Sequence, residues 1–251
     1  MNNVLSTAWT ALVVAAMATT AFACTEETAA DADSGADTNT SASTIPGPGY
    51  WVDRTYVVTV PATNWSKPKG IGSDVGAFVP RFAFTITGST ETQVDLLVGT
   101  AIDTAQDTCT PTSSFTGSSE TYPAVRIGPQ DFRARVVNDI DAENPIVVYA
   151  TLYDLEFVDI LPTDVAPAED GVLRGVIDTR ELYSLFSQLP DPTPDTVCAA
   201  SAAFEAPCTA CRDGEPYCIE LEAIGIGATE TGLDGISPIA ESDLDPSCLR
   251  D

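Results

Sequence analysis

The stretch Arg81-Phe82-Ala83-Phe84-Thr85-Ile86-Thr87 has the two-residue period of a β-strand, with both phenylalanines and the isoleucine on one face. A polar turn at 88–91 follows it, and residues 92–98 then return with apolar and β-branched side chains. Because two such segments joined by a short turn pair with each other, the sequence predicts an antiparallel hairpin.

Similar segments lie on both sides of this hairpin. Residues 56–60 precede it, and residues 132–137 and 146–158 follow it as a second pair. Two more short strands are predicted at 171–177 and 218–225. Several short strands with polar connections favour an antiparallel β-sandwich or a small barrel.

The helical content is expected in one insertion, residues 178–218. Asp178 stands three residues before Glu181, which is the spacing of a capping box and predicts a helix over 178–189. Prolines end this helix, and the last of them can open a second helix at 195–204. The predicted fold class is therefore mainly β, with a short two-helix, cysteine-rich insertion near the C-terminus.

Residues 1–23 have the features of a signal peptide. Their apolar run is too short to cross a bilayer as a helix, and small residues follow it up to Cys24. The sequence Ala21-Phe22-Ala23-Cys24 resembles the lipobox of bacterial lipoproteins, in which the signal is cut before a cysteine that then carries lipid. It is also an A-x-A site for ordinary signal peptidase, which would release a soluble protein. We expect lipidation at Cys24, and Thr25 in place of Asp resembles the pattern of lipoproteins sent to the outer membrane.

Residues 24–49 are expected to form an acidic, disordered linker. After Cys24 they contain one large apolar residue and five acidic residues without a basic one, so little apolar surface is available to offset the ordering entropy. Residues 50–251 are then long enough for a single β-rich domain.

The chain has seven cysteines, and an odd number in an oxidising compartment leaves one without a partner. If Cys24 carries lipid, six remain for three disulfides: Cys109, Cys198, Cys208, Cys211, Cys218 and Cys248. Bridges among the four clustered cysteines would pin the second helix to the sheet and would leave Cys109 and Cys248 to each other. A zinc site of four thiolates and a redox pair formed by Cys208 and Cys211 are the alternatives for the cluster.

Composition excludes several classes of function. With 37 acidic and 11 basic residues the formal charge is −26, which would repel phosphate backbones, so we expect no nucleic-acid partner. The chain contains no histidine, which removes the Ser-His-Asp and Cys-His nucleophile systems and imidazole metal sites. No catalytic residue and no cofactor is predicted.

One loop imitates a calcium site. Asp139, Asp141 and Glu143 have the alternate spacing of oxygen ligands in a calcium loop. However, Asn144 stands where the loop needs Gly, and Ala150 stands where it needs a bidentate Glu. A solvated hairpin loop in an acidic chain also explains these residues.

Two carboxylate pairs have the residue types that glycoside hydrolysis needs, since that reaction uses two acids and no histidine. Asp154 with Glu156, and Glu220 with Glu222, each share one face of a strand whose other face is apolar. We therefore expect these acids to point to water. The S-x-x-K match at 66–69 lies in a loop with Pro and Gly and has no partner motif, so we interpret it as chance.

The lipobox-like start, the acidic linker, the sandwich-like body, the segment Leu173 to Leu182 and the cluster Cys198 to Cys218 together resemble uncharacterised exported lipoproteins of myxobacteria and related groups. The resemblance implies a location in the cell envelope and brings no activity. We expect a lipid-anchored extracytoplasmic module at the outer membrane that binds a protein or glycan partner, or contributes to envelope structure, without catalysis. A carboxylate-based glycan hydrolase and a calcium-dependent adhesion or binding module are the alternatives.

Overall fold

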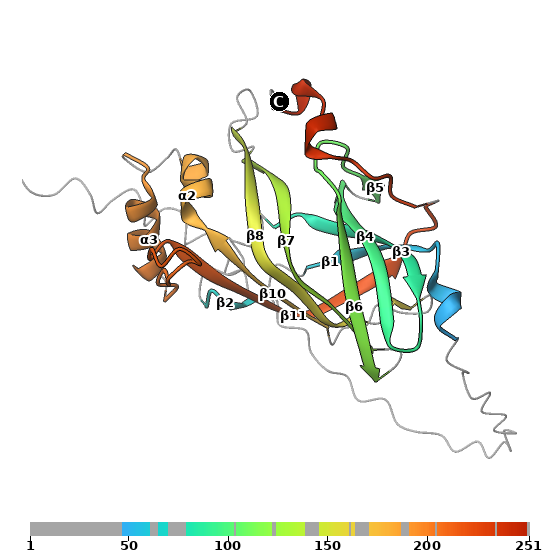
Figure 1. Cartoon of the computed structure of the whole chain (residues 1–251). Helices are drawn as coiled ribbons and strands as arrows, with labels where there is room; N and C mark the ends of the chain where they lie inside the picture. Colours follow the sequence, from blue (N-terminus) through green and yellow to red (C-terminus); the bar gives the residue numbers. More distant parts are fainter. Residues whose placement is uncertain are drawn as a thin grey trace, which may run out of the picture. The chain divides into compact units, whose positions relative to one another are not determined.

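Eight antiparallel strands form a ring in the computed structural model (Figure 1). The structure describes residues 47–60, 65–69, 79–102, 104–121, 124–138, 146–160, 162–163, 171–186, 191–203, 205–233 and 235–249. The strands are β1 (Thr55–Thr59), β3 (Arg81–Ser89), β4 (Gln93–Ile102), β6 (Ser113–Thr121), β7 (Ala124–Asn138), β8 (Ile146–Ile160), β10 (Gly171–Asp178) and β11 (Cys218–Glu230). Each strand pairs with the next one in this order, and β11 pairs back with β1. Of the two architectures that the sequence favours, the closed path is that of the small barrel.

The hairpin predicted from the sequence is the pair β3 and β4. Phe84 lies opposite Val98, and in the turn the N–H of Gln93 donates to the hydroxyl of Thr90 at 3.0 Å. The second predicted pair, β7 with β8, and the strands β10 and β11 are also present. The mainly β, antiparallel prediction is therefore confirmed.

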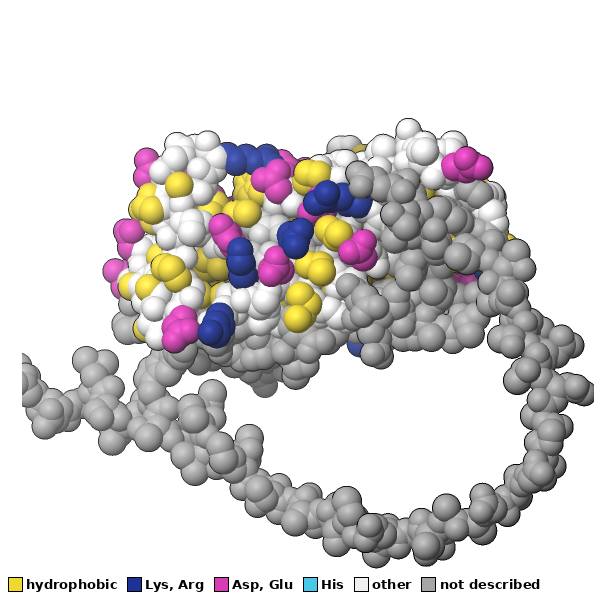
Figure 2. Space-filling view, turned by 90° about the horizontal axis from the view of Figure 1, so that it is seen from below, with side chains coloured by type: hydrophobic (Ala, Val, Ile, Leu, Met, Phe, Trp, Pro, Cys, Tyr) yellow, Lys and Arg dark blue, Asp and Glu magenta, His cyan; other side chains and the backbone are white. Residues whose placement is uncertain are grey.

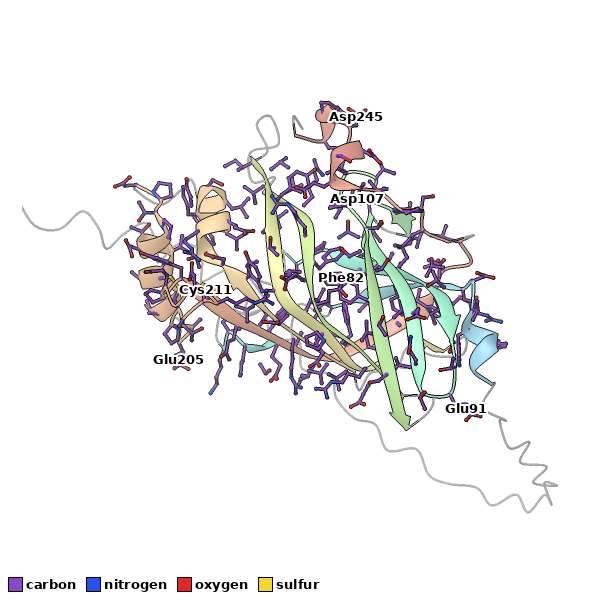
Figure 3. All side chains as sticks on the ribbon, viewed as in Figure 1. Phe82, Glu91, Asp107, Glu205, Cys211 and Asp245 are labelled. Atoms are coloured by element: carbon purple, nitrogen blue, oxygen red, sulfur yellow. A yellow bond between two sulfur atoms is a disulfide. The ribbon has the colours of Figure 1, made fainter. Side chains whose placement is uncertain are left out.

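Side chains fill the inside of the ring. The buried aromatic residues on the strands are Tyr56, Phe82, Phe84, Phe115, Phe132 and Phe157. Phe82, labelled in Figure 3, packs edge-on against Phe132 and Phe157, with ring centroids 5.6 and 5.2 Å apart. Such filling is typical of a barrel of this strand number.

Strand β6 was not predicted from the sequence. Its segment SSFTGSSET contains one large apolar side chain, Phe115, which is buried. The strand forms because β4 and β7 provide backbone partners on both sides. Gly117 permits a close approach, since a Cβ atom there would lie 2.8 Å from the carbonyl oxygen of Arg126. The neighbours of β6, rather than its own pattern, therefore determine its structure.

The remaining short elements attach to the ring. They are the strands β2 (Trp65–Lys67), β5 (Ala105–Gln106) and β9 (Pro162–Thr163), and the 3-10 helices η1 (Pro48–Trp51), η3 (Glu241–Asp243) and η4 (Pro246–Leu249). β2 pairs with β11 beyond the end of β1, so β1 and β2 follow one another along the same neighbour. All of these elements belong to one unit, residues 44–251.

The first predicted helix is shorter than expected. Asp178 is its N-cap and accepts a hydrogen bond from the N–H of Arg180 at 2.9 Å. The helix α2 (Thr179–Leu182) is a single turn that continues as the 3-10 helix η2 (Tyr183–Phe186), and the rest of the predicted span lies outside the described residues. The second helix, α3 (Pro194–Ala203), agrees with the prediction.

After β11, residues 235–249 run along the outside of the barrel, first against β1, β3 and β4 and then past Thr112 towards β7. The N–H of Ile236 donates to the hydroxyl of Thr85 at 2.9 Å, and the Ile236 side chain completes a second apolar cluster with residues of these three strands. Further along, a disulfide joins Cys248 to Cys109. This pair is the one predicted from the sequence if the four clustered cysteines bond among themselves. The C-terminal segment is thus fastened to the barrel at both of its ends.

Candidate functional site

Residues 209–217 form a loop that a disulfide closes at its base, and we call this segment the stapled loop. Cys211 is bonded to Cys218 at the start of β11. The backbone of Thr209 exchanges two hydrogen bonds with that of Cys218, at 2.6 and 3.1 Å. The cross-link fixes the path of the loop relative to the barrel strand that follows it.

The second disulfide of the cluster joins Cys198 on α3 to Cys208, with Cα atoms 5.5 Å apart. The helix is thus bonded to the chain that follows it, so the expectation of a bridge from helix to sheet is wrong. The zinc alternative is also wrong, because all four clustered sulfurs are in disulfides and none is a thiolate. Cys208 and Cys211 belong to different bridges, which excludes the redox pair.

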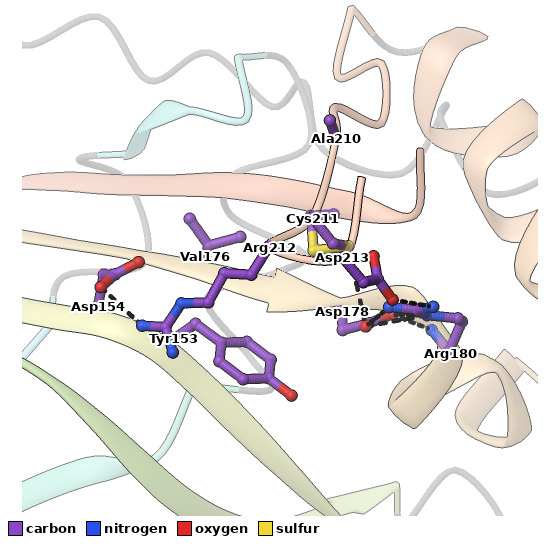
Figure 4. Close-up of a pocket in the computed structure, with 10 residues that line it drawn as sticks. Tyr153, Asp154, Val176, Asp178, Arg180, Ala210, Cys211, Arg212 and Asp213 are labelled. Carbon is purple, nitrogen blue, oxygen red and sulfur yellow. Dashed lines mark hydrogen bonds and ion pairs between the residues drawn. A yellow bond between two sulfur atoms is a disulfide. The ribbon is translucent and has the colours of Figure 1, made fainter. Parts of the chain in front are cut away.

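A pocket of about 360 Å³ lies between the stapled loop and the outer side of β8 and β10 (Figure 4). Tyr153 and Val176 line it from the strands, and Ala210 and the Cys211–Cys218 disulfide line it from the loop. Its charged lining residues are Asp154, Asp178, Arg180, Arg212 and Asp213. The volume lies within the range of small-ligand sites.

Arg212 reaches from the stapled loop to β7 and β8. Its two terminal nitrogens each donate to a carboxylate oxygen of Asp131 at 2.7 Å, and one of them also donates to Asp154 at 2.7 Å. The guanidinium carbon lies 5.1 Å from the centre of the Tyr153 ring. The hydrogen bonds from Arg212 lower the pKa of Asp131, and the same contacts raise the pKa of Arg212. Two carboxylates and an aromatic ring therefore hold one guanidinium group.

Arg180, at the start of α2, binds Asp213, the residue that follows Arg212 in the stapled loop. Its Nη1 donates to Asp213 at 2.7 Å, and its Nε donates to Asp178 at 2.9 Å. The hydrogen bond from Arg180 lowers the pKa of Asp213, and the bonds to Asp178 and Asp213 raise the pKa of Arg180. Both Arg212 and Asp213 are consequently tied to the barrel.

Glu181 lies behind the pocket-lining Tyr153. The Tyr153 hydroxyl donates to Glu181 Oε1 at 3.1 Å, and the Thr151 N–H donates to Oε2 at 2.5 Å. The carboxylate is thus engaged with β8, not in the capping box that the sequence predicted with Asp178. Burial and then the charge of Glu181 raise the pKa of Tyr153, so this phenol stays neutral at physiological pH.

The charges at this site do not cancel. Asp154, Asp178 and Asp213 line the pocket together with Arg180 and Arg212. Two further carboxylates lie just beyond this lining: Asp131, which accepts from Arg212, and Glu181, which accepts from the Tyr153 hydroxyl. Carboxylates are acceptors only. The pocket and its surroundings therefore suit a group that is cationic or donates hydrogen bonds, whereas an anionic ligand would be repelled.

The first predicted carboxylate pair is split between two environments. A bulge in β8 gives Asp154 a φ of 51°, and its exposed carboxylate contacts Arg212. Glu156 is only 9% exposed and lies 2.7 Å from Arg126. The expectation that these acids point to water holds for Asp154 and is wrong for Glu156, because Arg126 compensates the partly buried charge.

The second pair, on β11, is also neutralised by basic side chains. Glu220 lies 2.8 Å from Lys67, and Glu222 lies 2.9 Å from Arg174. Ser66 donates to Glu222 at 2.6 Å, so the serine of the S-x-x-K match is engaged by a carboxylate. The hydrogen bonds from Ser66 and Arg174 lower the pKa of Glu222.

Two predicted sites lie outside the described residues. These are the lipidation site Cys24 and the calcium candidates Asp139, Asp141 and Glu143. Conversely, sequence reasoning missed the contact between Arg212 and Asp131, which are 81 positions apart. The available signal is that Arg212 directly follows Cys211, where a disulfide fixes the backbone.

Two further findings concern the chain as a whole. None of the described helices combines the length and the apolar character that crossing a membrane requires. Comparison with protein-family models, with curated proteins and with solved structures finds no match to this chain.

Proposed function

We propose that this chain is a lipid-anchored binding module of the cell envelope, without catalysis, which holds a cationic group of its partner in the pocket under the stapled loop. The pocket is the observation that carries the proposal. It lies on the outside of a barrel whose interior is filled by side chains. Its walls come from two barrel strands and from a cross-linked loop.

The pocket is built from parts that are already fixed. A disulfide closes the stapled loop, and its Arg212 donates to Asp131 on β7. Its Asp213 accepts from Arg180 on α2, which also donates to Asp178 at the end of β10. A binding site that is ordered before the ligand arrives loses less conformational entropy on binding. This arrangement supports recognition of one defined group rather than a broad, adaptable contact.

The ligand chemistry follows from the charges. Arg212 already shows how this surface holds a cation, with Asp131 and Asp154 as acceptors and the Tyr153 ring beside it. An amino or guanidino group of a partner meets the same excess of carboxylates. Such a group can belong to a basic protein side chain or to an amino sugar of a glycan.

The carboxylate pairs support binding rather than hydrolysis. A glycoside hydrolase needs a carboxylic acid whose pKa is raised so that it can donate a proton. The pKa of Glu222 is instead lowered by Ser66 and Arg174. Glu156 and Glu220 are each paired with a basic side chain.

The location rests on the N-terminal sequence. A lipid at Cys24 and the acidic linker 24–49 would tether the domain to the outer membrane. Cys24→Ser should then abolish acyl labelling and release the chain from membranes, and unchanged membrane attachment of this variant would contradict the anchor.

The binding test uses the full chain and a variant that fills the pocket. Val176→Phe enlarges a half-buried side chain that lines the pocket, and Val147→Phe makes the same change on the neighbouring strand β8 outside it. Two labelled probes are titrated: an arginine-containing oligopeptide and a glucosamine oligosaccharide. Their neutral counterparts carry citrulline and N-acetylglucosamine, so each arm tests the same positive charge in a different partner class.

We expect one cationic probe to bind the natural chain and the Val147→Phe variant, and to bind Val176→Phe at least about tenfold more weakly, a loss of about 1.4 kcal/mol. Equal binding by both variants would mean that the acidic surface attracts cations without the pocket, and would contradict the proposal. Cleavage of either oligosaccharide by the natural chain would contradict the absence of catalysis.

A further inference from the structure

The outer side of β8, β10 and β11 carries side chains in two regular rows beside the pocket. The strand register places Val158, Val172 and Ile224 side by side, and we call them the apolar row. Ile224 is 49% exposed although it is large and apolar. Figure 2 shows this face, on which basic and acidic side chains alternate and hydrophobic ones lie between them.

The neighbouring row is charged. It consists of Arg126 on β7, Glu156 on β8, Arg174 on β10 and Glu222 on β11, and we call it the charged row. Arg126 lies 2.7 Å from Glu156. Arg174 lies between the two glutamates, 3.9 Å from Glu156 and 2.9 Å from Glu222. The signs along the row are therefore plus, minus, plus, minus across four adjacent strands.

A row of this kind is complementary to itself. A two-fold axis that runs parallel to the strands, between β8 and β10, reverses the order of the strands in the second copy. Arg126 then faces Glu222 of the second copy, and Glu156 faces Arg174 of the second copy. The same axis leaves each row facing its own counterpart, so Val158 meets Val172 of the second copy. Contacts of this isologous type build most symmetric dimers.

The overall charge of the chain makes this face distinctive. With Lys67 and Glu220, which are paired beside the charged row, the face has three basic and three acidic side chains. The chain has 37 acidic and 11 basic residues, so 34 acidic and 8 basic residues remain for the rest of it. Two copies that approach through this balanced face avoid the repulsion that the remaining acidic surface would produce.

We propose that the charged row and the apolar row together form an interface with a second copy of this chain. The charged row sets the direction and register of the contact, and the apolar row contributes surface that is removed from water. This proposal does not depend on the ligand of the pocket, because no residue of the two rows lines the pocket.

The test uses full chains that carry one of two different C-terminal tags and are expressed together. Arg126→Glu changes the row to minus, minus, plus, minus, and Glu222→Arg changes it to plus, minus, plus, plus. Each variant places like charges opposite one another in a dimer with itself. A mixture of the two variants restores opposite charges at all four positions.

We expect the tagged natural chains to purify together, and each variant paired with itself to do so at least about tenfold less, because facing like charges are costly. The pair Arg126→Glu with Glu222→Arg should purify together again. Circular dichroism of each variant shows whether it is folded, and the mixed pair serves as an internal control for this. Natural chains that do not purify together, or a mixed pair that stays apart, would overturn the proposal.

Discussion

Removing the disulfide between Cys109 and Cys248 should destabilise the domain more than removing the bridge of the stapled loop. The first bridge spans 139 residues, whereas the bridge between Cys211 and Cys218 spans 7. In the chain-entropy description a cross-link removes roughly 2.1 + 1.5R ln n cal/mol/K from the unfolded state, which at 25 °C is about 5.0 kcal/mol for the long loop and about 2.4 kcal/mol for the short one. The variant C109A/C248A should therefore lose about 2.7 kcal/mol more than C211A/C218A.

Equilibrium unfolding in urea, followed by tryptophan fluorescence, measures this difference, and the buried Trp51 reports on the barrel. The free energies in water have to be compared rather than the midpoints, because an uncrosslinked unfolded chain is more expanded and the slope m rises. If C109A/C248A is as stable as C211A/C218A, chain entropy is not the source of the effect. The hydrogen bonds between Thr112 and Ile239 would then be sufficient to hold the C-terminal segment.

Three further predictions concern the core, a strand contact and the stapled loop. Phe82→Ala should lower the free energy of unfolding by about 3–5 kcal/mol, because its ring is fully buried among two other phenylalanines; a loss below about 1 kcal/mol in urea unfolding would argue against a packed interior. Gly171→Ala should cost about 1–3 kcal/mol, since its Cβ atom would lie 2.6 Å from the carbonyl oxygen of Ile226, and an unchanged Tm would disprove this close approach. The stability that Arg212→Ala removes should depend on pH: Arg212 lowers the pKa of Asp131, so this contribution is present above the ordinary aspartate pKa of about 3.9 and disappears as the pH falls through the lower folded-state value. Urea unfolding of both proteins across the acidic range measures the difference, which must shrink on acidification and not grow.

The strands that sequence reasoning found are those that carry their own signal. Alternating Phe82 and Phe84 identify β3 without knowledge of its neighbours, because one face is apolar. β6 has no such signal, since hydroxyl side chains and Gly117 dominate it, and it is a strand only because β4 and β7 flank it. The length of α2 is also overestimated from the sequence, because the apolar spacing of 182–189 fits an α-helix whereas the structure turns to a 3-10 helix after Leu182.

The candidate site was less predictable than the fold. Cysteine counting identified a staple near the C-terminus, and a disulfide does close the loop that covers the pocket. The residues that matter most for its charge, Asp131 and Arg212, come from segments with no shared pattern and meet only in the folded barrel. The sequence likewise predicts a solvated carboxylate at Glu156. The pattern of one strand does not show that Arg126 and Arg174 on the adjacent strands lie beside this residue.

The seam between β1 and β11 also determines when the barrel can close as the chain folds. Arg54 and Glu230, 176 residues apart, meet there at 2.8 Å, and Tyr56 lies opposite Glu230 in the register. Until β11 has paired, β1 and β10 each keep an exposed edge, and such edges pair readily with other chains. Contacts of such long sequence separation also form slowly. Substitutions along this seam should therefore reduce the yield of folded protein in the cell more strongly than the free energy of unfolding of the finished barrel would predict.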